Sequence, residues 1–584
     1  MRSFFKIFFA SFLALLVFSL IAFFLLITFI GGLASKDRPT VNPRSVLVLN
    51  LGQDYREQSR ESPFSGFADN DELDVPGLYD VIRLIRKAKN DKNIAGIYIT
   101  ANNNPNGFAA SEEIRQALED FKESKKFVIA YGDIITQKAY YVATAADEIY
   151  LNPRGFFQWS GFAVDFAFFK GTLDKLDIRP QIFYAGKFKS ATEPFRTDKM
   201  TDANKLQTMD WLGDLYGYFL QTVADSRKLD TVVLRELAQS GKVQEPEDAL
   251  QNKLVDGLKY DDEMKEQLKG KMGLGKYDKM EFVSINKYSK TGGFKKFTGD
   301  KIAVIYAEGD IVDGKGNENN IGSEPYQQLI RKARLDRNIK AIVLRVNSGG
   351  GSTLASELIW RELSLAREEK PVVVSFGDVA ASGGYYISCA ADSIFASPVT
   401  ITGSIGVFSI IPNMGSFFQN KLGITFDGVK TSPFADNPSV TRPMTDAEQK
   451  MMQTSINNIY TDFKTRVANG RHIDTAVVES IAQGRVWSGM KALQHGLIDR
   501  FGGLERAITS AATLAQLTDY RVKEYPEPRS FFDKIFNAAA PLNINEAIEK
   551  EIGKDNYLWY KEMISVRQMM NQPQARLPFQ FFIH

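Results

Sequence analysis

The sequence predicts an α/β protein built from two copies of one unit, preceded by a single apolar helix. Three observations lead to this fold class. Apolar runs typical of buried strands alternate with amphipathic stretches typical of helices. A block of 69 residues recurs 245 positions later with 26 identities, which indicates an internal duplication. Near the N-terminus lies an uncharged apolar run that is long enough to span a membrane.

The N-terminal apolar run extends from Ile7 to Ile30 and follows Arg2 and Lys6. A helix of this length measures about 36 Å at ~1.5 Å per residue, more than the ~30 Å of a bilayer core. Signal peptides usually have only about 7–15 apolar residues, so we expect a retained transmembrane anchor. The sequence GGLAS, residues 31–35, leaves cleavage open as an alternative. The positive charges favour a cytoplasmic N-terminus, with the remaining chain across the membrane.

Composition excludes several kinds of function. The formal net charge of the 584 residues is +2, and 24% of them are charged, so nothing favours nucleic-acid binding. Cys389 is the only cysteine, which excludes an intrachain disulfide and a cysteine-based metal cluster. We expect Cys389 in the core. The sequence shows no cluster of metal ligands and no nucleotide motif, so we expect no cofactor.

The two copies have the same order of predicted strands, and helices connect them. The repeated block covers Ile85–Pro153 and Ile330–Pro398. Alternating strands and helices imply parallel pairing. The predicted strands are Ser45–Leu51, Ala95–Ile99, Phe127–Tyr131 and Glu148–Leu151 in the first copy, and Lys301–Ala307, Ala341–Val346, Val372–Phe376 and Ser393–Ala396 in the second.

This pattern divides the chain into five parts. Residues 1–35 form the cytoplasmic N-terminus and the anchor, and a polar linker at 286–300 separates the copies at 45–285 and 301–525. Residues 526–584 match neither copy, and we expect a helical tail with an aromatic end and no assigned role.

Ser382 is the candidate nucleophile. It follows the strand Val372–Phe376, which we expect Gly377 and Asp378 to end, and it precedes two glycines and an apolar helix. A serine at such a junction has its hydroxyl on a tight turn beside the free N–H groups of a helix N-terminus, as a nucleophile requires. A simple helix-capping turn is the alternative. The first copy has Gln137 at this position and could not serve as the same site.

A glycine-rich loop accompanies this serine. The sequence NSGGGS, Asn347–Ser352, follows the second strand of its copy, where the first copy has NNNPNG. The glycines can turn backbone N–H groups toward a pocket. One such group and the Gly383 N–H could form an oxyanion hole, although a flexible connecting loop is the alternative.

The base that activates Ser382 is not expected to be a histidine. His472 lies in a polar turn, His495 on the polar side of a short helix, and His584 at the terminus. None of these positions suggests a Ser-His-Asp triad. Lysine is the alternative base, because burial lowers its pKa from about 10.4 toward neutrality.

Lys189 is the candidate lysine, within the aromatic segment Gln181–Phe195 of the first copy. A gapped alignment with the second copy places it opposite Ala435. In that register the first copy has the lysine and the second has the serine. A surface lysine and an ion pair with Glu193 are the alternative interpretations. The rival bases are Lys187 and Lys430.

Five segments together resemble a known family. They are AIVLRVNSGGGS, PVVVSFGDVAASGGYY, TITGSIG, FKSATEPF and VWSGMKALQHGLIDRFGG, and they fall in the family's order over roughly residues 45 to 510. With the duplication and the anchor, the chain resembles the long form of the signal peptide peptidase A family, membrane-anchored bacterial serine proteases. The resemblance implies the ClpP/crotonase fold for each copy.

The resemblance also implies roles for individual residues. Ser382 matches the nucleophile, Lys189 the general base and proton donor, and Ser404 a serine that orients the lysine.

The oxyanion hole implied by the resemblance pairs Gly383 with Gly350, and Gly351 is the rival donor. The family's loop is usually NSPGG, so Gly349 stands at the proline position. We expect this departure to loosen the loop slightly and to leave the hole intact.

The implied activity is the degradation of released signal peptides, which are apolar and extended and suit recognition by β-augmentation. The implied assembly is a homotetramer on the bacterial inner membrane, on its periplasmic side, with sites at subunit boundaries. Whether Ser382 and Lys189 of this sequence meet within one chain or between chains stays open. A crotonase-like acyl-CoA enzyme, a non-enzymatic membrane scaffold, and a protease for other exported or membrane-protein fragments remain the competing readings.

Overall fold

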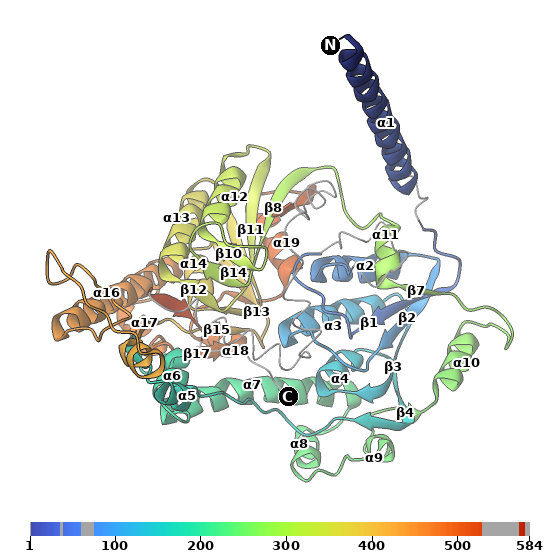
Figure 1. Cartoon of the computed structure of the whole chain (residues 1–584). Helices are drawn as coiled ribbons and strands as arrows, with labels where there is room; N and C mark the ends of the chain where they lie inside the picture. The colour runs from blue at the N-terminus through green and yellow to red at the C-terminus, as the bar shows by residue number, and fades with distance from the viewer. Residues whose placement is uncertain (1, 35–38, 60–74, 528–571, 578–584) are drawn as a thin grey trace.

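The structure, a computed structural model, describes residues 2–34, 39–59, 75–527 and 572–577. Two sheets, one from each half of the chain, lie side by side with helices packed around them (Figure 1). This arrangement agrees with the predicted duplication, and a third sheet combines strands from both halves.

The first copy forms a six-stranded sheet in the order β6-β4-β3-β2-β1-β7. All neighbouring strands are parallel, as predicted. The strands are β1 (Ser45–Asn50), β2 (Ile94–Thr100), β3 (Phe127–Ile135), β4 (Glu148–Phe157), β6 (Gly257–Leu258) and β7 (Phe282–Ser284). The helices α2 (Leu78–Asn90), α3 (Phe108–Lys122) and α4 (Gln137–Ala143) connect them and bury apolar faces against the sheet.

The second copy repeats this plan. Its sheet runs β17-β15-β13-β11-β8-β19, with β14 beside β13 and β18 beside β14. The strands are β8 (Asp300–Glu308), β11 (Ile339–Ser348), β13 (Val372–Ala381), β14 (Ser393–Ala396), β15 (Ile401–Gly403), β17 (Val486–Ser488), β18 (Arg500–Phe501) and β19 (Tyr520–Tyr525). The main helices are α12 (Ser323–Leu335), α13 (Thr353–Glu369), α14 (Gly383–Ser388) and α19 (Leu504–Leu514).

Strand β13 is longer than the sequence predicts. The expectation that Gly377 and Asp378 end it is wrong, because β13 continues to Ala381 and pairs there with β15. Asp378 is tolerated because its carboxylate accepts hydrogen bonds from the N–H groups of Ala109 (2.8 Å) and Ala110 (3.2 Å) at the start of α3. Burial nevertheless raises the pKa of Asp378. This contact joins the two copies.

The third sheet has the order β10-β9-β12-β20-β16-β5. Its strands are β5 (Arg179–Ala185), β9 (Asp310–Val312), β10 (Asn320–Gly322), β12 (Gly350–Ser352), β16 (Val407–Asn413) and β20 (Gln574–Arg576). Strand β5 of the first copy pairs antiparallel with β16 along its whole length, from Val407↔Ala185 to Asn413↔Arg179. The residues that follow β5, which include Lys189, therefore lie against the second copy.

Two helices of 26 residues occupy equivalent places, α7 (Asp202–Arg227) and α16 (Asp446–Arg471). In Figure 1, α7 runs below both sheets. Asp214 on α7 accepts a hydrogen bond from the Ser488 hydroxyl at 2.6 Å, and Asp210 pairs with Arg485 at 3.0 Å and with Lys491. These contacts attach the first copy to the second.

A buried ion cluster also joins the copies. Arg345 on β11 is fully buried and donates to Glu57 (2.8 Å) and Glu113 (2.6 Å) of the first copy. It also donates to the Ser375 hydroxyl at 2.8 Å and to the Phe376 carbonyl at 2.9 Å. Burial raises the pKa of Glu57 to about 7 against the opposing effect of Arg345. A buried charge with this many partners is costly to disrupt.

The N-terminal helix α1 (Arg2–Ala34) projects away from the two sheets (Figure 1). Among the residues that the structure describes, no helix meets the length and apolarity needed to cross a membrane. The predicted transmembrane span is therefore not supported by the structure.

The remaining parts of the predicted division are described only partly. The segment predicted as a linker contains most of the short helix α11 (Ile285–Lys290). The expected helical tail and its aromatic end fall at 528–571 and 578–584, outside the described residues. The other short helices are α5 (Lys170–Lys175), α6 (Glu193–Arg196), α8 (Thr231–Gln239), α9 (Pro246–Gln251), α10 (Asp261–Lys271), α15 (Gly415–Phe417), α17 (Thr475–Ile481) and α18 (Gly489–Gln494).

Candidate active site

Ser382 lies at the junction between β13 and α14, as predicted, in an unusual backbone conformation. Its φ is 53° and its ψ is −113°, a region that costs a non-glycine residue about 1–3 kcal/mol. The turn is held by two backbone hydrogen bonds, from Ser382 N–H to the Gly403 carbonyl and from Tyr386 N–H to the Ser382 carbonyl, both 2.8 Å. The hydroxyl is thereby presented at the first turn of α14.

Lys189 of the first copy meets this serine. Its Nζ lies 2.8 Å from Ser382 Oγ, 3.1 Å from Ser404 Oγ and 3.1 Å from the Ser404 carbonyl oxygen. The lysine follows β5, and the neighbouring Phe188 N–H donates to the Gln483 carbonyl at 2.8 Å. The structure therefore brings the three residues Ser382, Lys189 and Ser404 together from both copies.

The environment of Lys189 favours a neutral amine. Its side chain is only 1% exposed, and its hydrogen-bond partners are hydroxyl and carbonyl oxygens. Burial lowers the pKa of Lys189 well below the ordinary 10.5, because the charged form loses its hydration without gaining a carboxylate. A neutral amine at this distance can accept the proton of the serine hydroxyl.

The ion pair considered for Lys189 is not formed. Glu193 instead accepts hydrogen bonds from the Thr201 N–H (3.1 Å), the Thr201 hydroxyl (2.5 Å) and the Asn204 amide (3.0 Å). This carboxylate fixes the start of α7. Lys189 instead forms hydrogen bonds with Ser382 and Ser404.

The rival lysines lie elsewhere. Lys187 is exposed and has its Nζ 5.7 Å from the ring centroid of Phe188. Lys430 pairs with Asp436 at 2.6 Å. The structure brings neither of them to Ser382.

The sequence leaves open whether Ser382 and Lys189 meet within one chain or between chains. Ser382 and Lys189 meet within one chain. Strand β5 of the first copy pairs with β16 of the second, and this pairing carries Lys189 to the serine without a neighbouring subunit.

The candidate glycines of the loop, Gly350 and Gly351, lie beside Gly383 at the start of α14. A Cβ built on Gly350 would lie 2.5 Å from the Gly383 nitrogen, so the two backbones touch, and the φ of Gly350 is +99°. The Gly350 N–H donates to Ser348 Oγ at 3.1 Å. Gly351 belongs to β12 and faces strand β20. The loop thus offers its Gly351 N–H more readily than that of Gly350.

The histidines have other environments. His472 ends α16 in a left-handed conformation with φ of 54°. His495 packs on Trp487 with ring centroids 4.4 Å apart, and burial lowers its pKa. His584 lies outside the described residues.

The equivalent turn of the first copy has a structural role. The Gln137 side chain accepts hydrogen bonds from the N–H groups of Ser160 and Gly161, both 2.9 Å, and donates to the Gly161 carbonyl at 2.9 Å. These hydrogen bonds fix the loop after β4, and the position carries an amide where the second copy has a hydroxyl.

Comparison with known proteins identifies the family. Residues 120–275 and 364–518, together more than half of the chain, match Peptidase family S49. The chain belongs to this family. The two S49 matches agree with the duplication found in the sequence, and the chain is a serine protease.

Three relatives extend over most of the S49 chain. "Protease 4" of Salmonella typhi is 39% identical over 81% of this chain and 77% of its own. "Protease 4" of Haemophilus influenzae is 35% identical over 86% and 84%. "Serine protease SPPA, chloroplastic" of Arabidopsis thaliana is 34% identical over 82% and 70%. The chain thus corresponds to the long, duplicated form of these S49 proteases.

Similar solved structures match only part of the chain. A ClpP1 mutant from Listeria monocytogenes covers 35% of this chain and 94% of its own, at 14% identity and a TM-score of 0.24. A mutant of the 1510-N membrane-bound stomatin-specific protease covers 39% of this chain and 98% of its own, at 15% identity and a TM-score of 0.26.

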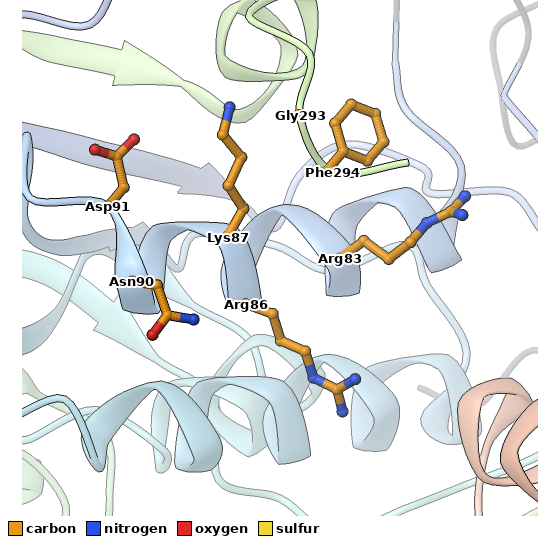
Figure 2. A pocket seen from close by; sticks show the side chains of 7 residues that line it. All are labelled: Arg83, Arg86, Lys87, Asn90, Asp91, Gly293 and Phe294. Atoms are coloured by element: carbon orange, nitrogen blue, oxygen red, sulfur yellow. The ribbon is translucent and has the colours of Figure 1, made fainter. Parts of the chain in front are cut away.

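A cavity of about 520 Å³ lies away from the serine, beside α2. Figure 2 shows the basic side chains of Arg83, Arg86 and Lys87 along its wall. They already have partners, since Arg83 pairs with Glu524, Arg86 with Glu505, and Lys87 donates to the Gly292 carbonyl at 2.7 Å. Two of the basic side chains that line the cavity therefore form ion pairs between the copies, and the third binds a backbone carbonyl.

Strand β20 is the part of the site that sequence reasoning missed. It lies between β12 and β16, next to the candidate glycines. The only local signal is the alternation of polar and apolar residues in Gln574–Leu577, between two prolines. This alternation is typical of a short strand.

Proposed function

We propose that the chain is a membrane-anchored endopeptidase that uses a Ser382–Lys189 dyad to degrade released signal peptides and similar apolar peptides. The observation that supports it best is the 2.8 Å distance from Lys189 Nζ to Ser382 Oγ in a buried site. A relative in Enterococcus faecium, 34% identical over 40% of this chain and 69% of its own, is named "Putative signal peptide peptidase SppA". Its name supports the proposed substrate class.

The proposed reaction proceeds through an acyl-enzyme. Neutral Lys189 takes the proton of Ser382 as the hydroxyl attacks a scissile carbonyl carbon. The N–H groups of Gly383 and Gly351 stabilise the oxyanion, and Lys189 then protonates the leaving amine. The same lysine activates a water molecule that hydrolyses the ester. Ser404 orients the lysine through its hydroxyl and carbonyl oxygens.

Gly351 is assigned as the second oxyanion donor in place of Gly350, because Ser348 Oγ occupies the Gly350 N–H. Removing one such donor from a protease typically costs about 10²–10³ in rate.

The attachment to a bacterial inner membrane rests on the apolar run from Ile7 to Ile30 and its preceding positive charges. The catalytic copies would face the periplasm. We expect the full chain to stay with membranes in alkaline carbonate and a chain lacking residues 1–35 to be released. Release of both would contradict the anchor.

The proposal keeps the division into an anchor, two copies at 45–285 and 301–525, and a tail. It also keeps the homotetramer as the assembly. Each copy is assigned the ClpP/crotonase-like fold. Light scattering of the detergent-purified chain measures the assembly, and a monomeric mass would contradict a tetramer.

The catalytic proposal is tested with Ser382→Ala and Lys189→Ala. Each should lower the hydrolysis of a chromogenic peptide ester by at least about 10³-fold, since dyad members act as a unit. The control is Lys187→Ala, an exposed lysine on the same segment, which should retain activity. Full activity in Lys189→Ala would contradict the assigned base, and turnover of an enoyl-CoA instead of the ester would favour the crotonase-like reading.

A further inference from the structure

Gln207 on α7 contacts the chain on both sides of Lys189. Its side chain is only 2% exposed. The amide nitrogen Nε2 donates to the Phe188 carbonyl oxygen and to Ser190 Oγ, both at 3.0 Å. Phe188 and Ser190 are the immediate neighbours of Lys189 in the sequence. One buried side chain therefore holds both ends of the short segment that carries the candidate base.

The amide oxygen of Gln207 binds the second copy. Oε1 accepts a hydrogen bond from the Val486 N–H at 3.2 Å. Val486 lies opposite Gly403 where β17 pairs with β15, and the Gly403 carbonyl accepts the Ser382 N–H at 2.8 Å. Ser404, the other hydroxyl partner of the lysine, follows Gly403 directly. Gln207 thus links the segment of the base to the strand pair that holds both serines.

These contacts require an amide. The Phe188 carbonyl can only accept a hydrogen bond and the Val486 N–H can only donate one, so the side chain between them must offer a donor and an acceptor at once. An ionised carboxylate lacks the donor, and an apolar side chain lacks both. A buried backbone group without a partner is costly. Without the amide, the two backbones should therefore move apart.

The second copy shows that the helix itself does not need this amide. The equivalent helices α7 and α16 both have 26 residues, and they begin after the N-caps Thr201 and Thr445. At the same place after the cap, α7 has Gln207 and α16 has Met451, which is exposed. The buried amide therefore belongs with the Lys189 segment and not with the helix as such.

We propose that Gln207 is a positioning residue for the base, which fixes Lys189 at hydrogen-bond distance from Ser382. This inference rests on the proposed function. Gln207 acts through the backbone on either side of the lysine and through the strand pair that carries the serines. Its loss should therefore change the rate of the chemical step and the burial of the lysine amine, while the binding of the peptide is kept.

Gln207→Met tests the proposal, because methionine, the residue of the second copy, can form neither hydrogen bond. For the chromogenic peptide ester, kcat should fall about 10–100-fold with little change in KM, since a displacement of about 1 Å can cost roughly 10² in rate. A displaced Lys189 would also be less buried, which raises its pKa. The acidic limb of kcat/KM should therefore move to higher pH.

Rates are divided by the concentration of active sites, measured by labelling Ser382 to completion with a serine-reactive probe, so that a misfolded fraction does not count. A second variant separates the hydrogen bonds from the volume of the side chain. Gln207→Glu keeps the size and the acceptor for Val486, but its ionised carboxylate has no hydrogen to donate to the Phe188 carbonyl. It should lose about as much kcat as Gln207→Met.

Thr208→Val is the matched control on the same helix. Thr208 is also buried, and its hydroxyl contacts Asn204 at 3.4 Å. This variant should keep the kcat and the acidic limb of the wild type. A wild-type limb in both Gln207 variants, or an equal shift in Thr208→Val, would overturn the positioning role.

A double variant separates this inference from the proposed function. Because Gln207 acts through the lysine, adding Gln207→Met to Lys189→Ala should change the residual rate by less than about twofold. A further loss as large as that of Gln207→Met alone would overturn the positioning role and leave the dyad standing. Full activity in Lys189→Ala would overturn the assigned base and this inference with it.

Discussion

Lys189 is the residue on which the proposed chemistry depends, because it must be neutral to work as a base. Its ordinary pKa of 10.5 is lowered well below that value by burial. Activity should therefore be present above the lowered pKa and be lost as the pH falls through it and the amine gains a proton. We expect the acidic limb of kcat/KM for the peptide ester to have its midpoint below pH 10.5. A limb at the ordinary lysine value would contradict a buried base.

Ser404 is expected to act through Lys189. Ser404→Ala removes a hydroxyl 3.1 Å from Nζ, and a hydrogen bond to a charged group is worth about 1.5–3 kcal/mol. Because the lysine becomes charged during attack, kcat should fall about 10–100-fold with little change in KM, and the acidic limb should move to lower pH. Steady-state kinetics across pH measure both effects.

The control for this variant is Ser409→Ala on β16. Ser409 is also buried, and its hydroxyl has no hydrogen-bond partner within the described structure. Its kinetics should match the wild type. An equal loss in both variants would mean that Ser404 supports only the packing of the region.

At the scale of single elements, the turn after α17 supports the lysine. Gly484 has φ of +74°, and a Cβ built on it would lie 2.7 Å from both Lys189 Cβ and Lys189 N. Gly484→Ala should therefore push the lysine away from Ser382. A displacement of about 1 Å can cost roughly 10² in rate, which the ester assay measures.

Gly423→Ala is the matched control, since Gly423 has a similar φ of +66° and a Cβ there would meet nothing within 4 Å. Both variants carry the same backbone strain. If Gly423→Ala lost as much activity as Gly484→Ala, the strain and not the contact with Lys189 would be responsible.

The elements also show what a sequence can predict. The strands and the Ser382 turn follow local patterns, and Gln137 in the first copy is the reason why the turn of the second copy was chosen as the candidate site. The pairing of β5 with β16 joins Ala185 to Val407, and nothing local in either strand specifies that partner. The choice between Gly350 and Gly351 depends on which N–H Ser348 already binds, which a run of glycines does not reveal.

For the whole molecule, the buried Arg345 cluster holds the copies in register. Arg345→Leu would leave the carboxylates of Glu57 and Glu113 buried without their cation, which typically costs about 3–5 kcal/mol. Thermal unfolding of the full chain should show a clear fall in Tm.

Lys265→Leu provides the comparison, because Lys265 is 52% exposed and pairs with Asp261, which is 56% exposed. Exposed pairs contribute about 0–1 kcal/mol, so its Tm should change little. Equal shifts in the two variants would show that the Arg345 cluster contributes no more than a surface pair.

The pairing of β5 with β16 has a consequence for the synthesis of the chain. Lys189 is translated 193 residues before Ser382, and β16 is translated later still. A nascent chain that ends within the first copy has a base and no nucleophile. A chain that has just gained Ser382 still lacks the strand that brings the lysine to it. Under the proposed mechanism, proteolysis therefore cannot begin before β16 has been translated and has paired with β5.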